Sequence, residues 1–146
     1  IKIMRKALLI LTVFTVIFSL STTNLLAQGK NSPFLITGKI PHLTKLLMQQ
    51  WDNSELNLSA EQKTKLLVVR KETLTGVKKL GPEIGSLEEQ VVDGTLDGKT
   101  PDELSSLVDA IAKLKAEATM VQLQCVYVTS EILDQQQLDF LMDLYL

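Results

Sequence analysis

Apolar residues recur at steps of three and four along two long stretches of the chain, and this spacing predicts two long helices. Over residues 101–132 the pattern runs through four heptads without a break, and residues 59–92 carry the same rhythm. Helices of these lengths would span about 48 Å and about 51 Å. Because eight turn residues separate two arms of nearly equal length, the sequence predicts an antiparallel hairpin.

Shorter helical segments flank this hairpin. Between Pro41 and Trp51 the leucines lie at helical spacing, and the polar residues 52–54 would end the helix. A second short helix is expected after residue 133, where the chain carries a helix-start signature. The predicted fold class is therefore all-α, a bent antiparallel two-helix hairpin with a short helix at each end and four helices in the protomer.

The first arm of the hairpin contains the dipeptide Gly81-Pro82, which would normally indicate a loop. Proline removes a backbone hydrogen bond and clashes with the preceding helical turn. The heptad count nevertheless carries from Leu80 to Ile84 without slipping. We therefore expect a kinked but continuous helix, whose bend would give the hairpin a concave face.

A five-residue box of leucine, a short polar residue, two variable residues and glutamine occurs twice. In each box the short polar side chain would cap a helix N-terminus, and the glutamine would reach back to the N–H of the cap residue. One such box is common at a helix start, whereas two that bracket a long hairpin are much less so. The first box is Leu58, Ser59 and Gln62, and the second is Leu133, Asp134 and Gln137.

The chain begins with the pattern of an export signal. Arg5 and Lys6 form a positive segment, Ala7 to Leu20 is an apolar run, and a more polar stretch ends at the small residue Ala27. The competing interpretation is a membrane-anchoring helix, but an apolar core of 14 residues is short for a span of about 20. We expect residues 1–27 to be a cleaved Sec-type signal peptide that leaves no stable membrane anchor.

Two regions follow this signal segment. Residues 28–40 contain glycine, serine and proline without hydrophobic periodicity and predict a flexible N-terminal arm, and residues 41–146 form the helical domain. Three of the 15 basic residues and none of the 17 acidic residues lie in the signal segment, so the net charge changes from −2 to −5 on processing. An acidic mature chain argues against nucleic acid as a partner.

Few residues of the chain suggest chemistry. The single cysteine, Cys125, lies in the apolar seam of the second arm, where a small core residue is a simpler interpretation than a reactive, dimer-bridging or ligand role. His42 is the only histidine. Because the sequence has no P-loop, no Cys-x-x-Cys pair and no histidine–carboxylate–nucleophile set, we expect a protein that is not an enzyme and uses no cofactor.

The turn between the two arms has some polar residues of a calcium loop. Asp93, Thr95, Asp97 and Gly98 would occupy positions one, three, five and six of such a loop. Position twelve, where calcium needs a bidentate glutamate, would be Leu104. The glycines are better explained as helix-stop and turn residues, so we expect no metal site.

Charge is unevenly distributed along the chain. From Ser59 to Leu80 six basic residues stand against two acidic ones, whereas from Glu83 to Asp109 eight acidic residues stand against Lys99 alone. A solvated helix surface is the simplest explanation, and the functional one is a basic, partly apolar surface that holds flexible polypeptide. The candidate binding residues are Lys63, Arg70 and Lys71 on the first arm, and Met120, Leu123 and Tyr127 on the second.

The second group of candidates has two further explanations. Met120, Leu123 and Tyr127 lie off the apolar seam, and they could equally form a dimer face or pack under the short helices. Two arms of about 50 Å each cannot bury a broad apolar stripe against one another and two short helices alone. The sequence therefore predicts a homodimer.

An exported all-helical chain with two Leu-[Ser/Thr]-x-x-Gln-type boxes resembles the Spy/CpxP family of periplasmic proteins over roughly residues 43–146. The first box is close to the family's Leu-Thr-x-x-Gln, whereas the second carries Asp134 in place of threonine. The resemblance implies a periplasmic location and a bent-hairpin protomer that pairs into a cradle-shaped antiparallel dimer. Metal-sensing relatives in this family rely on histidine-rich sequences, which are absent here.

The resemblance also implies a function. It indicates an ATP-independent chaperone or holdase that binds unfolded or partly folded polypeptides by weak contacts at many sites. The alternative, from a different class, is an envelope-stress or metal-responsive regulatory subunit that binds the periplasmic domain of a sensor kinase or a divalent metal. An aggregation-suppression assay separates the two, because a regulatory subunit would leave unrelated polypeptides unprotected.

Overall fold

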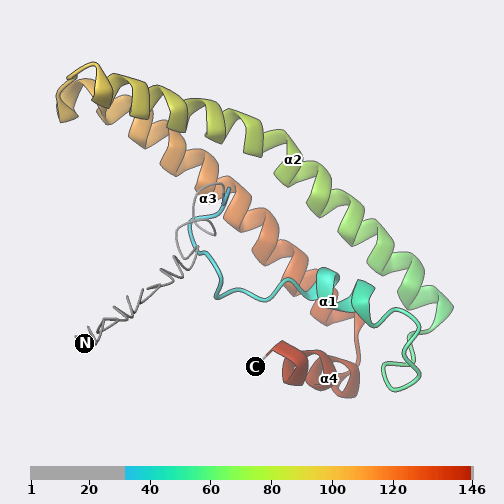
Figure 1. The fold of residues 1–146 in the computed structure, drawn as a ribbon. Coiled ribbons are helices and arrows are strands. Elements are labelled where there is room, and N and C mark those ends of the chain that lie inside the picture. Colours follow the sequence, from blue (N-terminus) through green and yellow to red (C-terminus); the bar gives the residue numbers. More distant parts are fainter. Residues whose placement is uncertain (1–31, 146) are drawn as a thin grey trace, which may run out of the picture.

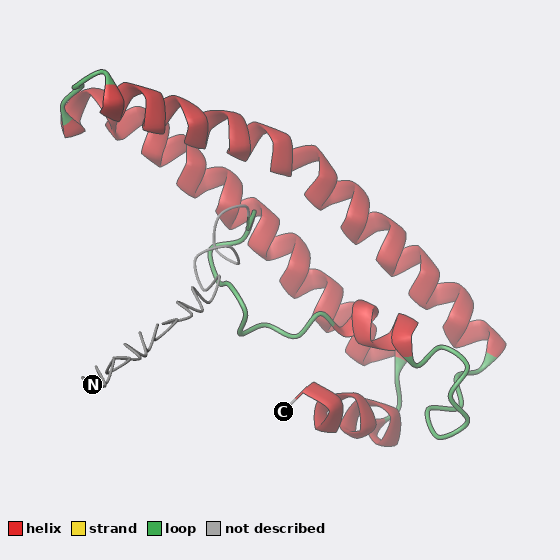
Figure 2. Cartoon of the chain, in the orientation of Figure 1, coloured by secondary structure: helices red, strands yellow, loops and turns green. Residues whose placement is uncertain are grey.

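The structure is a computed structural model that describes residues 32–145. The expected signal peptide, residues 1–27, lies outside the described residues. The described chain contains no strand, so the prediction of an all-α protein is confirmed (Figure 2). Its helices are α1 (Leu43–Gln49), α2 (Ala60–Leu96), α3 (Pro101–Ile132) and α4 (Gln135–Tyr145).

Helices α2 and α3 form the long antiparallel hairpin that the apolar spacing predicts (Figure 1). With 37 and 32 residues they are about 55 Å and about 48 Å long. The short helices lie at the open end of the hairpin, where α1 contacts α2, α3 and α4. We call this end, with α1 and α4, the base, and the end with residues 97–100 the tip.

Helix α2 continues without interruption through Gly81 and Pro82, as the unbroken heptad count predicts. Because Pro82 has no N–H, the carbonyl of Lys78 lacks its usual partner one turn ahead. Helix α2 nevertheless stays α-helical on both sides of Pro82. Figure 1 shows α2 bowed along its length, with α3 following beneath it.

The turn at the tip is shorter than the sequence predicted. We expected the first arm to end at Val92 and eight residues to form the turn, but α2 runs on to Leu96, and only residues 97–100 connect it to α3. Gly98 takes the left-handed conformation, with φ +78°. Its N–H and that of Lys99 donate to carbonyls of the last helical turn, which is the Schellman arrangement.

The prediction was wrong at Gly94, which looked like a helix stop. Gly94 is buried inside α2, and a Cβ at this position would lie 2.7 Å from Cδ2 of Leu104. The missing side chain therefore lets the two helices approach near the tip. On the other side of the turn, Thr100 and Glu103 form a capping box, and α3 starts at Pro101.

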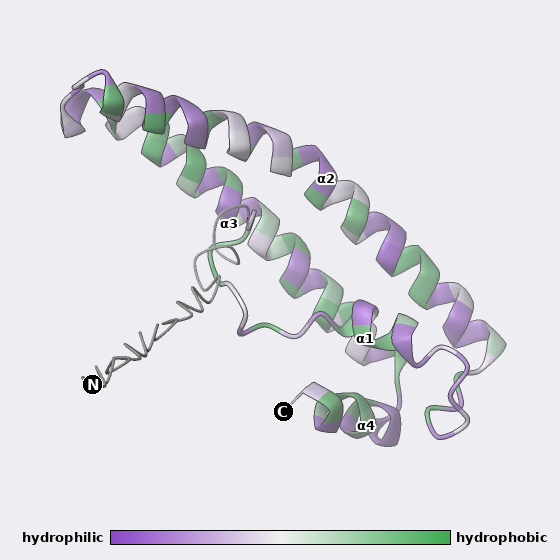
Figure 3. Ribbon diagram, in the orientation of Figure 1, coloured by the Kyte–Doolittle hydropathy of each residue, from purple (hydrophilic) through white to green (hydrophobic). Residues whose placement is uncertain are grey.

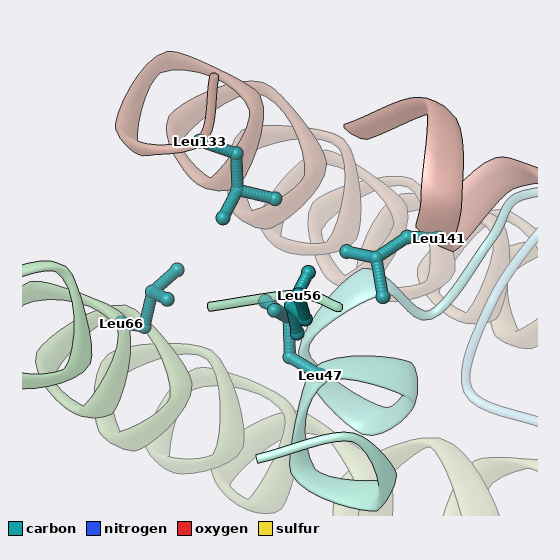
Figure 4. Close-up of a cluster of buried hydrophobic side chains, with 5 residues drawn as sticks. All are labelled: Leu47, Leu56, Leu66, Leu133 and Leu141. Carbon is teal, nitrogen blue, oxygen red and sulfur yellow. The ribbon is translucent and has the colours of Figure 1, made fainter. Parts of the chain in front are cut away.

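The main hydrophobic core lies at the base. A cluster of five leucines, each at most 8% exposed, joins α1, α2, α4 and the two connections beside them (Figure 4). Because every helix of the base contributes to this cluster or packs against it, the short helices are fixed to the hairpin there. The five residues are Leu47, Leu56, Leu66, Leu133 and Leu141.

Toward the tip, α2 and α3 have mainly each other as packing partners. Ile84 and Leu104 are buried there, but Val92, Leu96 and Val108 are 56%, 81% and 51% exposed. Figure 3 shows hydrophobic and hydrophilic residues alternating along both helices. Apolar burial is therefore concentrated at the base and thin at the tip.

The described part of the expected N-terminal arm lies against α3. Residues 32–40, which we call the arm, form no helix or strand. The backbone N–H of Leu35 donates to Oγ1 of Thr119 at 2.8 Å, and Nε2 of Gln122 donates to the carbonyl of Ile40 at 3.3 Å. These two hydrogen bonds place the arm on α3, and its flexibility stays a prediction.

Candidate functional site

The two boxes meet at the base, where their glutamine side chains pair. Nε2 of Gln62 donates to Oε1 of Gln137 at 2.7 Å, and Nε2 of Gln137 lies 3.2 Å from Oε1 of Gln62. Gln62 also donates to the carbonyl of Ile132, and Gln137 to that of Leu56, both at 3.0 Å. This amide pair, which we call the glutamine clasp, ties the start of α2 to α4 and to the end of α3.

Each glutamine of the clasp also completes its own capping box. Oε1 of Gln62 accepts from the N–H of Ser59, and Oε1 of Gln137 accepts from that of Asp134, both at 3.0 Å. The side chains of Ser59 and Asp134 accept in return from the backbone of the two glutamines, at 3.1 Å and 2.9 Å. Both boxes thus have the capping geometry that their sequence indicates.

The leucines of the boxes belong to the base as well. Leu133 is part of the leucine cluster, and Leu58 packs against it. The boxes therefore hold the fold together, and Leu133 and Gln137 are buried in the base. Contact between the boxes was not predicted, although an antiparallel hairpin brings its two open ends together and so places Ser59 near Leu133.

Among the basic candidates, Lys63 is engaged locally. Its Nζ lies 3.1 Å from a carboxylate oxygen of Asp52 and 5.5 Å from the ring centroid of Trp51. The side chain of Lys63 is 30% exposed, against 88% for Asp52. Lys63 therefore joins the connection after α1 to α2, and less of its charge is available to a partner.

The other two basic candidates line a shallow groove of about 330 Å³ on the surface of α2. Arg70 and Lys71 are accompanied there by a third cation and by two leucines that are 49% and 44% exposed. No acidic residue lines this groove. We call it the basic groove, and its residues are Leu67, Arg70, Lys71, Leu74, Thr75 and Lys78.

The apolar candidates form an exposed stripe on α3. Met120, Leu123 and Tyr127 are 63%, 39% and 60% exposed, so they do not pack under the short helices. Met120 also borders a mainly apolar cleft of about 450 Å³ between α2 and α3. This hairpin cleft is lined by Val69, Glu72, Thr73, Gly76, Met120, Val121, Gln124, Cys125 and Val128.

The structure does not bring the basic and the apolar candidates into one pocket. No residue lines both the basic groove and the hairpin cleft. Successive residues of a helix are about 100° apart, so Lys71 points about 200° away from Val69 in the cleft. A polypeptide would have to pass around α2 to touch both surfaces.

Cys125 lies in the packed seam, as its place in the apolar pattern predicts. It is 7% exposed, and its Sγ is 3.8 Å from Oγ1 of Thr44 in α1. The thiol also forms part of the wall of the hairpin cleft. In residues 32–145, no group of three or more histidine, cysteine, aspartate or glutamate side chains is placed to hold a metal ion.

We expect the Cys125 thiol to react slowly with a water-soluble disulfide reagent in the native protein and at the ordinary thiol rate in urea, because burial shields it. Absorbance of the released thiolate measures both rates. The chain has no other cysteine, so the signal reports this site alone. Fast native labelling, or a disulfide-linked dimer on a non-reducing gel, would contradict this prediction.

Buried polar residues on α3 were missed by the sequence reasoning. Thr119, Gln122 and Thr129 are at most 5% exposed, on the side of α3 that faces α1 and the arm. Oε1 of Gln122 and Oγ1 of Thr129 are buried and have no hydrogen-bond partner among the described residues. The seven-residue spacing of Gln122 and Thr129 was a detectable signal, because it places two polar groups on one helix face.

Two carboxyl groups at helix starts have a lowered pKa. The hydrogen bond and charge of Lys65 hold the pKa of the Glu61 carboxyl below its ordinary value. Hydrogen bonds from the backbone and hydroxyl of Thr100 likewise lower the pKa of Glu103. A lowered pKa in the folded state stabilises the fold above the unfolded pKa, and this contribution is lost as pH falls through the folded pKa.

Comparison of the chain with protein families, with curated proteins and with solved structures finds no match. Within residues 32–145, no helix has both the length and the apolar character that crossing a membrane requires.

Proposed function

We propose that the protein is an ATP-independent periplasmic chaperone or holdase for unfolded or partly folded polypeptides. The observation that carries this proposal is apolar surface left exposed beside cations on a long hairpin. Leu67 and Leu74 are about half exposed beside Arg70 and Lys71 in the basic groove. The apolar stripe of Met120, Leu123 and Tyr127 adds a second exposed surface.

These two surfaces suit an unfolded partner for a physical reason. Apolar contact is non-directional and proportional to area, so it does not require one particular sequence. Cations on flexible side chains attract carboxylates of the partner from a distance and are screened by salt. Several weak contacts spread along an extended hairpin would hold a flexible chain without nucleotide hydrolysis, since each contact can be released separately.

An aggregation-suppression assay tests this proposal. A reduced, unfolding client of unrelated sequence should stay in solution when the protein is present at a near-stoichiometric ratio, with or without divalent metal. Light scattering measures the aggregation of the client over time. Protection that is absent, or that depends on a metal, would overturn the chaperone proposal and favour the regulatory alternative.

Reversing the charges of Arg70 and Lys71 to glutamate should slow client capture on the order of tenfold at low salt, because steering acts mainly on association. Stopped-flow fluorescence of a labelled client measures the rate. The fold should be retained, since exposed charges contribute little to stability. The same reversal at Lys65 and Lys79, which lie outside the basic groove, is the matched control. Equal slowing in both variants would show that only net charge matters.

We also propose that two protomers pair in antiparallel fashion. Seam residues such as Leu107 and Ile111 remain partly exposed in the single chain. Antiparallel pairing would place the basic half of one hairpin, residues 59–80, beside the acidic half of the other, residues 83–109. Both the uncovered apolar seam and the opposite charges of the two halves support this arrangement.

Light scattering after size exclusion should therefore give the mass of a dimer at tens of micromolar. Because the pairing sets opposite charges together, dissociation should begin at a higher protein concentration in high salt than in low salt. A monomer at both salt concentrations would contradict the proposed assembly. A dimer whose stability does not respond to salt would remove the charge argument and leave the apolar seam as its cause.

A further inference from the structure

Two buried polar side chains of α3 hold the arm by its backbone. Thr119, 5% exposed, accepts from the N–H of Leu35, and Gln122, 4% exposed, donates to the carbonyl of Ile40. Every polypeptide segment carries these backbone groups whatever its sequence, proline's missing N–H excepted. An acceptor and a donor placed about one turn apart on α3 are therefore suited to polypeptide in general.

The side chains of the arm are only partly covered in this contact. Leu35 and Ile36 are 55% and 45% exposed, so about half of the surface of each stays uncovered. The ring of Phe34 lies 6.0 Å from that of His42, at a tilted angle. The hydroxyl of Tyr145 reaches the carbonyl of Gly38 only at 3.5 Å. An occupant held by a few single contacts can be displaced.

The site also has hydrogen-bonding capacity that the arm does not use. Oε1 of Gln122 is buried and has no partner among the described residues. A buried acceptor without a partner is unfavourable, and a backbone N–H from another segment would satisfy it. The α3 surface can therefore make more hydrogen bonds to polypeptide than it makes to the arm.

We propose that the α3 surface around Thr119 and Gln122 is a binding site for polypeptide backbone, and that the arm is its tethered occupant, which unfolded clients displace. This inference rests on the proposed chaperone function and assigns a site to it. Because only Pro41 and His42 separate Ile40 from α1, the arm competes at a high effective concentration. Only clients that bind at several places on the hairpin would overcome this competition.

The test is a proline substitution in the arm of the full chain. Leu35→Pro removes the N–H that Thr119 accepts and leaves α3 unchanged. We expect this variant to bind reduced, carboxymethylated lactalbumin about fivefold more tightly than the parent, which is the effect of one hydrogen bond lost by the competitor. Thr37→Pro is the matched control, since its N–H makes no contact with α3 in the described structure. Faster tryptic cleavage after Lys39 should report arm release in Leu35→Pro and not in Thr37→Pro.

A second variant locates the site. Thr119→Val removes the acceptor from α3 and keeps the shape of the side chain. The arm should again be released, but client binding should be no tighter than in the parent, because clients lose the same acceptor. Fluorescence anisotropy of the labelled client measures all four affinities.

The outcomes separate the inference from the function on which it rests. Equal client binding by the parent and Leu35→Pro would overturn the inference alone. Binding by Thr119→Val as tight as that of Leu35→Pro would also overturn it, because the arm would then cover some other surface. If neither the parent nor Leu35→Pro binds the client, the proposed chaperone function itself fails.

Discussion

Replacing Gln137 with leucine should lower the free energy of unfolding by about 3 kcal/mol, because several buried groups lose a partner at once. Gln137 is 6% exposed, and its amide serves the Leu56 carbonyl, the Asp134 N–H and Gln62. Leucine can reproduce none of these hydrogen bonds. Urea unfolding followed by helical circular dichroism measures the change.

The matched control is Gln136→Leu, one residue earlier on the exposed side of α4. It should change stability by less than about 0.5 kcal/mol, as is usual for surface substitutions. A double-mutant cycle with Gln62→Leu adds a second check. The double variant should lose less than the sum of the single ones, with a coupling of about 1–2 kcal/mol, since each glutamine is the other's partner. Strict additivity would show that the clasp does not form.

Truncating Leu141 to alanine should cost about 3 kcal/mol, because Leu141 is fully buried in the cluster that joins α4 to the rest of the base. The loss combines the transfer of buried methyl groups with the cavity that they leave. Thermal and urea unfolding measure it. Because α4 has 11 residues and few neighbours besides this cluster, its helical signal should be lost with or before that of the hairpin.

Leu144→Ala is the control for this prediction, since Leu144 lies one turn away on α4 and is 49% exposed. It should cost less than about 0.5 kcal/mol. If both truncations are equally mild, α4 is not docked on the leucine cluster. If both are equally severe, the outer face of α4 is covered, and a second protomer is then the first candidate for what covers it.

The hairpin was predictable because its signals are local and repeated. Apolar steps of three and four, the capping boxes at Ser59 and Thr100, and the unbroken heptad count through Pro82 all agree on two long helices. The position of the turn was not predictable, because a glycine such as Gly94 can either end a helix or let a facing helix approach closely. Only its approach to Leu104 on the facing helix decides between these roles.

The candidate site was less predictable for a related reason. Each capping box can be recognised within five residues, but the clasp and the arm contact join residues far apart in the chain. Leu35 and Thr119 are 84 positions apart, and Gln62 and Gln137 are 75 apart. The arm residues that contact Thr119 and Gln122 lie 84 and 82 positions away, so the local sequence does not show that the arm covers them.

The long span of the clasp bears on the order in which the molecule folds. Residues 97–100 join helices that are neighbours in sequence. The hairpin can therefore form from the tip with only a small loss of loop-closure entropy. The hydrogen bonds of the clasp span 70 to 81 positions and can form only after α2 and α3 are both in place. Contacts that form after the rate-limiting step slow unfolding without speeding folding. The tip would thus determine how quickly the native state is reached, and the base how long it lasts.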